Sequence, residues 1–468
     1  MRRITLPFIA GLLPLHVLPN TWTVGPTRAY TAPSQVSTLV SDGDTVNIDA
    51  GVYPDDVARW QANDLVLRGI GGMAHLESNG NAWGGKAIWV IQGNHATVEW
   101  MEFSECQVPD QNGAGIRLEG LGLTVRHCHF HHNQNGILCG EYHPSTMRIE
   151  HSEFGYNGHG DGYSHNLYIG AIDSLILRST YSHHAVVGHE LKSRAWVNLI
   201  EHNRFSNEAD GTASREIDLP NGGQAYLIGN VVQQGAQGEN SNLVGFGMEG
   251  LSNPGPHALY AVNNTLVNEK TNGTFFQAPA ETFFKAYNNV LAGGGSFMST
   301  WPATLDTLAN LRSTSIAYIA FADAMNYDYR IDEGSPAHSM GYPAGLATSG
   351  YPLVALYEYV HPADATLRCQ HALLDAGAFE TCTTTGLPVH DGHEASAAFP
   401  NPAMDLIAVR ARQPLSPRSL MVVDAQGRTV SAPVQHAQDR FLFDLHGLAP
   451  GFYRVRSDDG ASWPFVKL

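Results

Sequence analysis

The sequence predicts an all-β protein, a right-handed parallel β-helix (a solenoid) followed by a small C-terminal Ig-like β-sandwich. Two observations predict the β-helix. A six-residue phrase returns every 24 to 34 residues between about residues 100 and 295, and a period of this length indicates stacked supersecondary units. The apolar runs are also short, and none has the i, i+3, i+4, i+7 spacing of a helix. A plain β-sandwich would instead predict a turn roughly every 8–12 residues and no such long period.

The repeated phrase closes on an apolar anchor residue that we expect to point into the core. These anchors are Phe103, Phe130, Phe154, Tyr181, Phe205, Val232, Leu266 and Leu291. The last two copies contain Asn pairs at 263–264 and 288–289, which suit turns because Asn tolerates a left-handed backbone. Residues one period apart should therefore be neighbours on one wall.

Length and charge limit the class of protein. The chain has 468 residues, enough for one large core and a smaller domain. It carries 44 acidic and 27 basic residues, a net charge of −17, which argues against nonspecific binding of nucleic acid. After the N-terminal stretch no segment is apolar enough to span a membrane. We expect a monomer.

Composition shifts divide the chain into four segments. Residues 1–20 contain two arginines and a short apolar stretch broken by Pro7 and Pro14, which predicts a signal peptide. Residues 21–380 should form the β-helix. The Thr-, Gly- and His-rich residues 381–396 predict a linker, and residues 397–468 should form the small β-sandwich.

The five cysteines cannot all pair within one chain because their number is odd. Cys369 and Cys382 are close in sequence and could form a disulfide in an oxidising compartment. Cys128 and Cys139 are expected to be small core residues.

Phrases at both ends of the predicted β-helix, and in the tail, resemble known families. The Asp42–Tyr53 phrase resembles the opening of pectate-lyase-like β-helix domains, and the Asn326–Asp332 and Asp375–Glu380 phrases resemble their usual end in secreted bacterial proteins. The tail is similar to the C-terminal sorting domain of the type IX secretion system. Its matching phrases are Phe399–Pro402, Val423–Arg428 and Leu448–Val455. This resemblance implies export by the type IX machinery to a secreted or cell-surface location; the alternative is an ordinary Ig-like accessory domain.

Three consecutive coils between residues 160 and 225 concentrate the ionisable side chains. With the repeats in register, Leu167, Leu191 and Ile217 should point inward, and alternation along a strand then turns their neighbours outward. We expect one outward column of Asn166, Glu190 and Glu216 and a second of Tyr168, Lys192 and Asp218, with His165, His189 and Arg215 just before the strands. Two stacked glutamates need a cation or a raised pKa. A solvated charged wall, with Lys192 and Asp218 as a simple ion pair, is the structural alternative.

Part of this region resembles chondroitinase B and related alginate lyases. The succession is Lys192-Ser193, Asn203-x-Phe205, Arg215 and Gly229-Asn230. The resemblance implies that Lys192 is a base, that Arg215 is an acid, and that Asn166, Glu190 and Glu216 are candidate Ca²⁺ ligands. The family's paired glutamates upstream of the lysine are absent here. Arg194 competes for the acid role, because Arg215 would point inward if its strand began that early.

These residue types suit β-elimination from a uronate. The reaction needs neutralisation of the carboxylate, a base for the C5 proton and a donor for the leaving O4. His165, His189 and Tyr168 are alternative base or acid groups, and Asp218, Asn221 and Asn166 are candidate substrate contacts. The prediction is a secreted polysaccharide lyase acting on an acidic polysaccharide.

Three other functions stay open. A glycoside hydrolase needs a carboxylate pair, for which Asp161, Asp210 and Asp218 are available, although no Asp-Asp pair lies on the repeat strands. A uronate C5-epimerase shares the proton abstraction and differs in returning the proton. A noncatalytic glycan-binding surface protein would present aromatic platforms.

Overall fold

The computed structural model describes residues 18–369 and 373–382, together with the strands of the tail within 398–467. The predicted signal peptide and most of the predicted linker lie outside the described residues. The segment boundaries therefore stay predictions. Within the described part the chain has three short 3-10 helices and no α-helix. None of these helices is long and apolar enough to cross a membrane.

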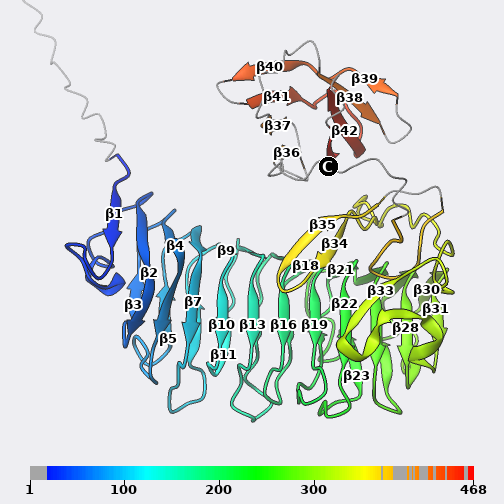
Figure 1. Cartoon of the computed structure of the whole chain (residues 1–468), viewed down its shortest axis with the longest axis horizontal. Helices are drawn as coiled ribbons and strands as arrows, with labels where there is room; N and C mark the ends of the chain where they lie inside the picture. Colours follow the sequence, from blue (N-terminus) through cyan, green and yellow to red (C-terminus); the bar gives the residue numbers. More distant parts are fainter. Residues whose placement is uncertain are drawn as a thin grey trace, which may run out of the picture.

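Residues from Thr21 to Ser313 wind into a three-sided parallel β-helix, shown from blue to yellow-green in Figure 1. The first side, which we call the site sheet, is a ten-stranded parallel sheet. Its strands are β3 (Ala58–Trp60), β5 (Ala87–Ile91), β8 (Ala114–Leu118), β11 (Asn135–Cys139), β14 (Leu167–Ile169), β17 (Leu191–Ser193), β20 (Ile217–Leu219), β23 (Asn242–Phe246), β26 (Thr274–Gln277) and β29 (Ser296–Met298).

The other two sides are joined at the N-terminal end, where the long strands β2 (Thr45–Pro54) and β4 (Val66–Glu77) take part in both. The first strand, β1 (Thr21–Val24), pairs with β2. The short helix η1 (Pro33–Gln35) lies between β1 and β2 in the sequence. The second side contains β6 (Ala96–Glu99), β9 (Leu123–Arg126), β12 (Thr146–Glu150), β15 (Ser174–Arg178), β18 (Val197–Glu201), β21 (Gln224–Ile228), β24 (Ala258–Val262), β27 (Phe283–Tyr287) and β30 (Thr304–Leu308). The third contains β7 (Met101–Ser104), β10 (His129–His131), β13 (Glu153–Gly155), β16 (Tyr181–His183), β19 (Arg204–Ser206), β22 (Val231–Gln234), β25 (Thr265–Asn268), β28 (Val290–Gly293) and β31 (Leu311–Ser313).

The predicted anchors stack inside the solenoid with one exception. Phe103, Phe130 and Phe154 are fully buried, and their rings stack at centroid distances of 4.9 and 4.8 Å. The anchor predicted at Tyr181 is wrong: Ser182 pairs with both Phe154 and Phe205 and takes the inward position. Its hydroxyl lies 2.9 Å from both the backbone oxygen and Oε2 of Glu190, which share its one proton, so a buried polar contact replaces a ring at this coil.

The Asn pairs lie at the corner between the second and third sides, as predicted. Asn263 and Asn288 have φ of +54° and +57°, the left-handed conformation. Their followers, Asn264 and Asn289, are buried, and Asn264 Nδ2 donates to Asn289 Oδ1 (2.9 Å) and to Leu227 O (2.8 Å). The same ladder satisfies the buried backbone groups of successive corners.

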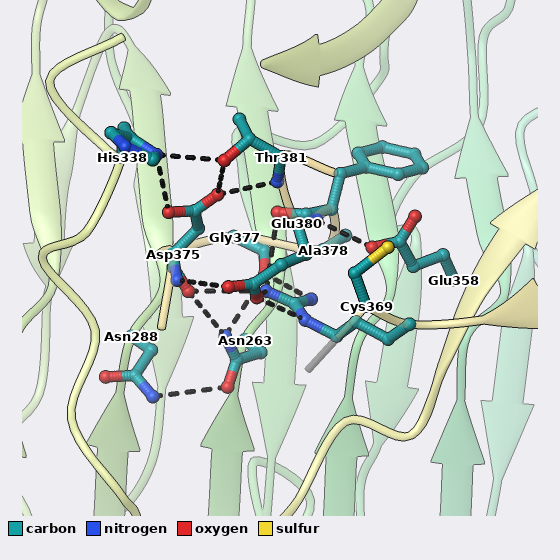
Figure 2. A network of polar contacts seen from close by, with 12 residues as sticks. Asn263, Asn288, His338, Glu358, Cys369, Asp375, Gly377, Ala378, Glu380 and Thr381 are labelled. Carbon is teal, nitrogen blue, oxygen red and sulfur yellow. Dashed lines mark hydrogen bonds and ion pairs between the residues drawn. The ribbon is translucent and has the colours of Figure 1, made fainter. Parts of the chain in front are cut away.

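Short elements after the β-helix pack against the outer faces of its second and third sides: η2 (Ile316–Ile319), β32 (Phe321–Asp323), η3 (Ala324–Asn326), β33 (Asp328–Ile331), β34 (Tyr357–Val360) and β35 (Asp364–Leu367). Figure 2 shows how the Asp375–Glu380 phrase is then bound to the corner. Asn263 Nδ2 donates to Asp375 O (3.0 Å). Ala378 N also donates to Thr265 Oγ1 (3.0 Å). Cys369 and Cys382, which are close enough in sequence to pair, form a disulfide, and Cys128 and Cys139 are buried and free, as expected.

The tail forms two four-stranded antiparallel sheets. One contains β36 (Ala398–Phe399), β37 (Leu406–Arg410), β41 (Arg440–Asp444) and β40 (Val434–Ala437), and the other contains β39 (Thr429–Val430), β38 (Leu420–Asp424), β42 (Gly451–Ser457) and β43 (Ser462–Lys467). Val409, Val422, Phe443, Val455 and Phe465 are buried in one apolar cluster. The predicted small β-sandwich is therefore present.

Candidate active site

Three adjacent strands of the site sheet, β14, β17 and β20, position the predicted second column. Tyr168 pairs with Lys192, and Lys192 pairs with Asp218. Leu167, Leu191 and Ile217 are fully buried, so the inward register is confirmed. The outward column of Tyr168, Lys192 and Asp218 is thus a contact set, as expected.

The predicted first column is wrong. Asn166, Glu190 and Glu216 are each 0% exposed. Each lies one residue before the first residue of its strand, in the corner that leads into the site sheet, where strand alternation does not apply. Asn166 therefore cannot contact substrate.

Buried hydrogen bonds engage these side chains. Asn166 Nδ2 donates to Glu190 Oε2 (2.5 Å), Ser182 Oγ donates to the same oxygen (2.9 Å), and Ala185 N donates to Glu190 Oε1 (3.0 Å). Asn207 Nδ2 donates to Glu216 Oε1 (3.0 Å). Both oxygens of Glu190 are thus occupied as acceptors.

Burial favours the neutral acids in this corner. Desolvation raises the pKa of Glu190 to about 7, against partly compensating hydrogen bonds, and raises the pKa of Glu216 well above its ordinary value. Calcium takes six to eight oxygen ligands, usually including ionised carboxylates. The predicted set of Asn166, Glu190 and Glu216 does not fit that ion in this arrangement.

Lys192 and Arg194 together bind the carboxylate of Glu249. Lys192 Nζ lies 2.7 Å from Glu249 Oε1, and Arg194 Nη2 lies 2.7 Å from Glu249 Oε2. These contacts outweigh the opposing effect of burial and lower the pKa of Glu249 to about 2. The two cations therefore form a fork that fits one carboxylate.

Sequence reasoning missed Glu249 because it lies 57 residues after Lys192 and outside the strands. It follows β23, inside the longest interval between anchors, which runs from Val232 to Leu266. An interval longer than the repeat indicates an inserted loop. That excess length was the available signal.

Arg215 points outward and not into the core, because β20 begins only at Ile217. Its Nη1 donates to Asp218 Oδ1 (2.8 Å) and its Nη2 to Gln277 Oε1 (3.2 Å). Gly245 pairs with Asp218 on one side and with Gln277 on the other, so it lies between the two partners of Arg215. A Cβ added at Gly245 would lie 3.4 Å from the guanidinium carbon of Arg215. The missing side chain leaves room for the guanidinium to cross this coil.

Asp218 lies beneath the cations and does not face solvent. It is 1% exposed, and its Oδ2 lies 3.4 Å from Lys192 Nζ and 3.6 Å from His189 Nε2. The predicted substrate contact through Asp218 is therefore wrong in this conformation. Its carboxylate instead holds Lys192 and Arg215 in place.

His165 and His189 stack at a centroid distance of 4.9 Å. The backbone N–H of His189 donates to His165 Nδ1 (2.9 Å), and that of Arg215 donates to His189 Nδ1 (3.1 Å). Desolvation and nearby cations lower the pKa of His165 well below 6.5 and that of His189 to about 3. Both rings are thus neutral with the proton on Nε2, so the predicted base role fits neither.

Tyr168 and Asn221 flank Arg194. Arg194 Nε donates to the Tyr168 hydroxyl (3.1 Å), and Arg194 Nη1 donates to Asn221 Oδ1 (2.5 Å). Hydrogen bonds to Tyr168 and Glu249 offset desolvation and raise the pKa of Arg194. Because the Tyr168 oxygen accepts from Arg194, its own proton remains able to donate.

The carboxylates considered for hydrolysis have separate partners. Asp161 Oδ1 accepts from Ser164 Oγ (2.8 Å), Asp210 Oδ1 lies 3.1 Å from His184 Nε2, and Asp218 is covered as described. A cavity of about 600 Å³ lies away from the three cations, along β19 and the covering segments. Arg204, Tyr327, Tyr359, His361 and Phe379 are among its lining residues.

Comparisons with known proteins agree with this architecture. The model of the right handed beta helix region matches residues 72–226, and the model of the secretion system C-terminal sorting domain matches residues 397–467. The chain is a right-handed β-helix protein with a type IX secretion sorting domain. This β-helix protein is therefore exported, to a secreted or surface-attached location.

Solved structures with a parallel β-helix resemble this chain to different degrees. The structure of pectate lyase Pel9A matches with a TM-score of 0.55 at 12% identity, over 78% of this chain and 97% of that chain. Pectin methylesterase PemA from Erwinia chrysanthemi matches at 0.33 and 9%, over 66% and 97%. The PL6 family alginate lyase AlyGC matches at 0.31 and 13%, over 79% and 59%. The first likeness supports the fold. No curated protein sequence matches the chain.

The β-helix family match includes Tyr168, Lys192, Arg194 and Arg215 and ends before Glu249. The carboxylate that occupies the fork thus comes from outside the matched region.

Proposed function

We propose that this protein is a secreted carbohydrate-active enzyme, a polysaccharide lyase that cleaves a uronate-containing glycan by β-elimination. The observation that carries the proposal is the fork of Lys192 and Arg194, which grips a carboxylate through two contacts of 2.7 Å. A uronate offers the same group. Neutralising that carboxylate stabilises the charge that develops when the C5 proton leaves.

Each group around the fork has a role in this proposal. Arg194, held by Asn221, neutralises the uronate. Lys192, after losing its own proton to solvent, takes the C5 proton, the electron pair forms the C4–C5 double bond, and the C4–O4 bond breaks. The Tyr168 hydroxyl then donates its proton to O4. Arg215 and Asp218 are positioning residues beneath them, and Arg215 replaces Tyr168 as the acid only if its contact with Asp218 opens.

The test is a substrate screen with the purified, tag-free protein. Alginate, pectate, glucuronan and glycosaminoglycans are incubated separately, and the 4,5-unsaturated uronate is followed by its far-ultraviolet absorbance. We expect turnover of at least one uronate, and Lys192→Ala to lower kcat about 10²- to 10⁴-fold. The matched control is Lys285→Ala, since Lys285 lies on β27 and pairs with Asp306. Full activity in folded Lys192→Ala would move the base elsewhere.

Other products separate the alternatives. New reducing ends without absorbance would indicate a hydrolase, and exchange of the C5 proton with solvent without cleavage would indicate a C5-epimerase. Binding without either would favour a glycan-binding protein. The 600 Å³ cavity supports the glycan-binding function, because Tyr327, Tyr359 and Phe379 line it. Aromatic rings pack well against sugars in concave sites.

A further inference from the structure

A cluster of two histidines and a glutamate lies on the third side of the β-helix, away from the candidate active site. It contains His75 of β4, Glu102 of β7 and His131 of β10, strands that follow one another near the N-terminal end in Figure 1. Each residue offers one ligand atom, and these atoms lie within 4.8 Å of one another. Among the described residues, no other group of three His, Cys, Asp or Glu side chains meets this geometry.

Stacking of the coils brings the three side chains together. His75 pairs with Glu102, and Ser104 of the same strand pairs with His131. His131 Nε2 lies 2.9 Å from Glu102 Oε1, and His75 Nδ1 lies 4.0 Å from Glu102 Oε2. The side chains are 18 to 25% exposed. A small ion could reach them from solvent.

The second nitrogen of each ring already has a partner. His75 Nε2 lies 2.7 Å from Ser104 Oγ, and His131 Nδ1 lies 2.9 Å from His132 Nδ1. Such outer contacts fix the tautomer and the orientation of a metal-binding histidine. They leave His75 Nδ1 and His131 Nε2 facing Glu102.

We propose that His75, Glu102 and His131 bind a divalent first-row transition metal ion of the Zn²⁺ class. Two imidazole nitrogens and one carboxylate oxygen suit zinc, whereas Ca²⁺ and Mg²⁺ prefer oxygen ligands alone. Three protein ligands leave a fourth position open to solvent. The ion links three successive coils.

The experiment uses the tag-free full chain after treatment with EDTA and dialysis. Co²⁺ is added in steps, and its visible d–d absorbance is recorded. Bound Zn²⁺ is then counted by mass spectrometry after gel filtration. We expect one saturable equivalent of each ion, with loss of the Co²⁺ band in both Glu102→Gln and His131→Gln.

Three further variants sharpen the result. Ser104→Ala removes only the outer contact of His75 and should weaken binding about 10- to 100-fold. His95→Ala, an exposed histidine beside Asp64, should bind as the wild type does. Absence of a saturable band, or a band that survives both ligand variants in folded protein, would overturn the proposal. The proposal would also be overturned if the Co²⁺ band were lost in Glu153→Gln and kept in Glu102→Gln. Glu153 contacts His183, one coil further along the β-helix.

Discussion

At the scale of single residues, Glu249 occupies the position at which a substrate carboxylate would bind in the candidate site. Its carboxylate occupies both arms of the fork, at 2.7 Å from Lys192 and 2.7 Å from Arg194. A uronate that binds the same two cations must compete with it. Glu249 is about half exposed, with 46% of its side chain open to solvent, so the loop that carries it can release the carboxylate without exposing a core.

Glu249→Gln is therefore expected to strengthen substrate binding. The amide has no charge, so it competes less well for the two cations, and solvent screening limits the gain. We expect KM for the glycan identified in the screen to fall about 3- to 10-fold, measured by initial rates at low salt. Glu281→Gln removes one acidic charge from an exposed position and should leave KM unchanged. A rise in KM in Glu249→Gln would instead make Glu249 a substrate contact.

Glu190 should make stability depend on pH. Its folded pKa of about 7 is raised above the ordinary 4.5 by burial, so the folded state holds a proton that the unfolded state releases. The contribution of this proton to the free energy of unfolding is complete below about pH 4.5 and is lost as pH rises through about 7. The loss is on the order of 3 kcal/mol for one such group.

The measurement is urea unfolding of wild type and Glu190→Gln at pH 5 and pH 8. The wild type should lose more free energy of unfolding between these values than the variant does. Glu281→Gln serves as the control and should follow the wild type. Equal pH dependence in wild type and Glu190→Gln would mean that Glu190 is ionised throughout.

At the scale of elements, the corners decide which side chains are available for chemistry. Along β14, β17 and β20 side chains alternate, and the expected column follows from the repeat alone. One residue earlier, alternation ends and Asn166, Glu190 and Glu216 turn into the corner. Ser182 also departs from the anchor pattern. A serine at this inward position gives the buried Glu190 a hydrogen-bond donor.

The attachment of the Asp375–Glu380 segment to the β-helix should depend on the ion pair between Arg368 and Glu380. Arg368 Nη2 lies 2.8 Å from Glu380 Oε2, and the side chains are 3% and 0% exposed. Glu380→Gln removes the carboxylate that contacts the buried guanidinium, which is expected to cost about 3–5 kcal/mol. The cost is read from urea unfolding midpoints. Arg330→Ala breaks an exposed pair with Asp328 and should cost less than about 1 kcal/mol. Similar costs in both variants would contradict this account.

At the scale of the whole molecule, the residues proposed for catalysis and the sorting domain lie in different parts of the chain. The sorting domain spans residues 397–467, whereas the residues proposed for catalysis lie between 168 and 249. Deleting residues 397–468 is expected to retain the protein inside a host that has the type IX machinery. Immunoblots of cell and medium fractions measure this. Lys192→Ala, which changes only the proposed chemistry, should be exported as the wild type is.

The sequence by itself determined the solenoid, the sorting sandwich, the Asn corner and the column of Tyr168, Lys192 and Asp218. A fixed period converts distance along the chain into stacking, so these features follow from local pattern. The tertiary structure alone decided the burial of Glu190, the arrival of Glu249 at the fork and the meeting of His75 with His131. Corners and inserted loops follow no period, and their side chains are placed by contacts between distant segments.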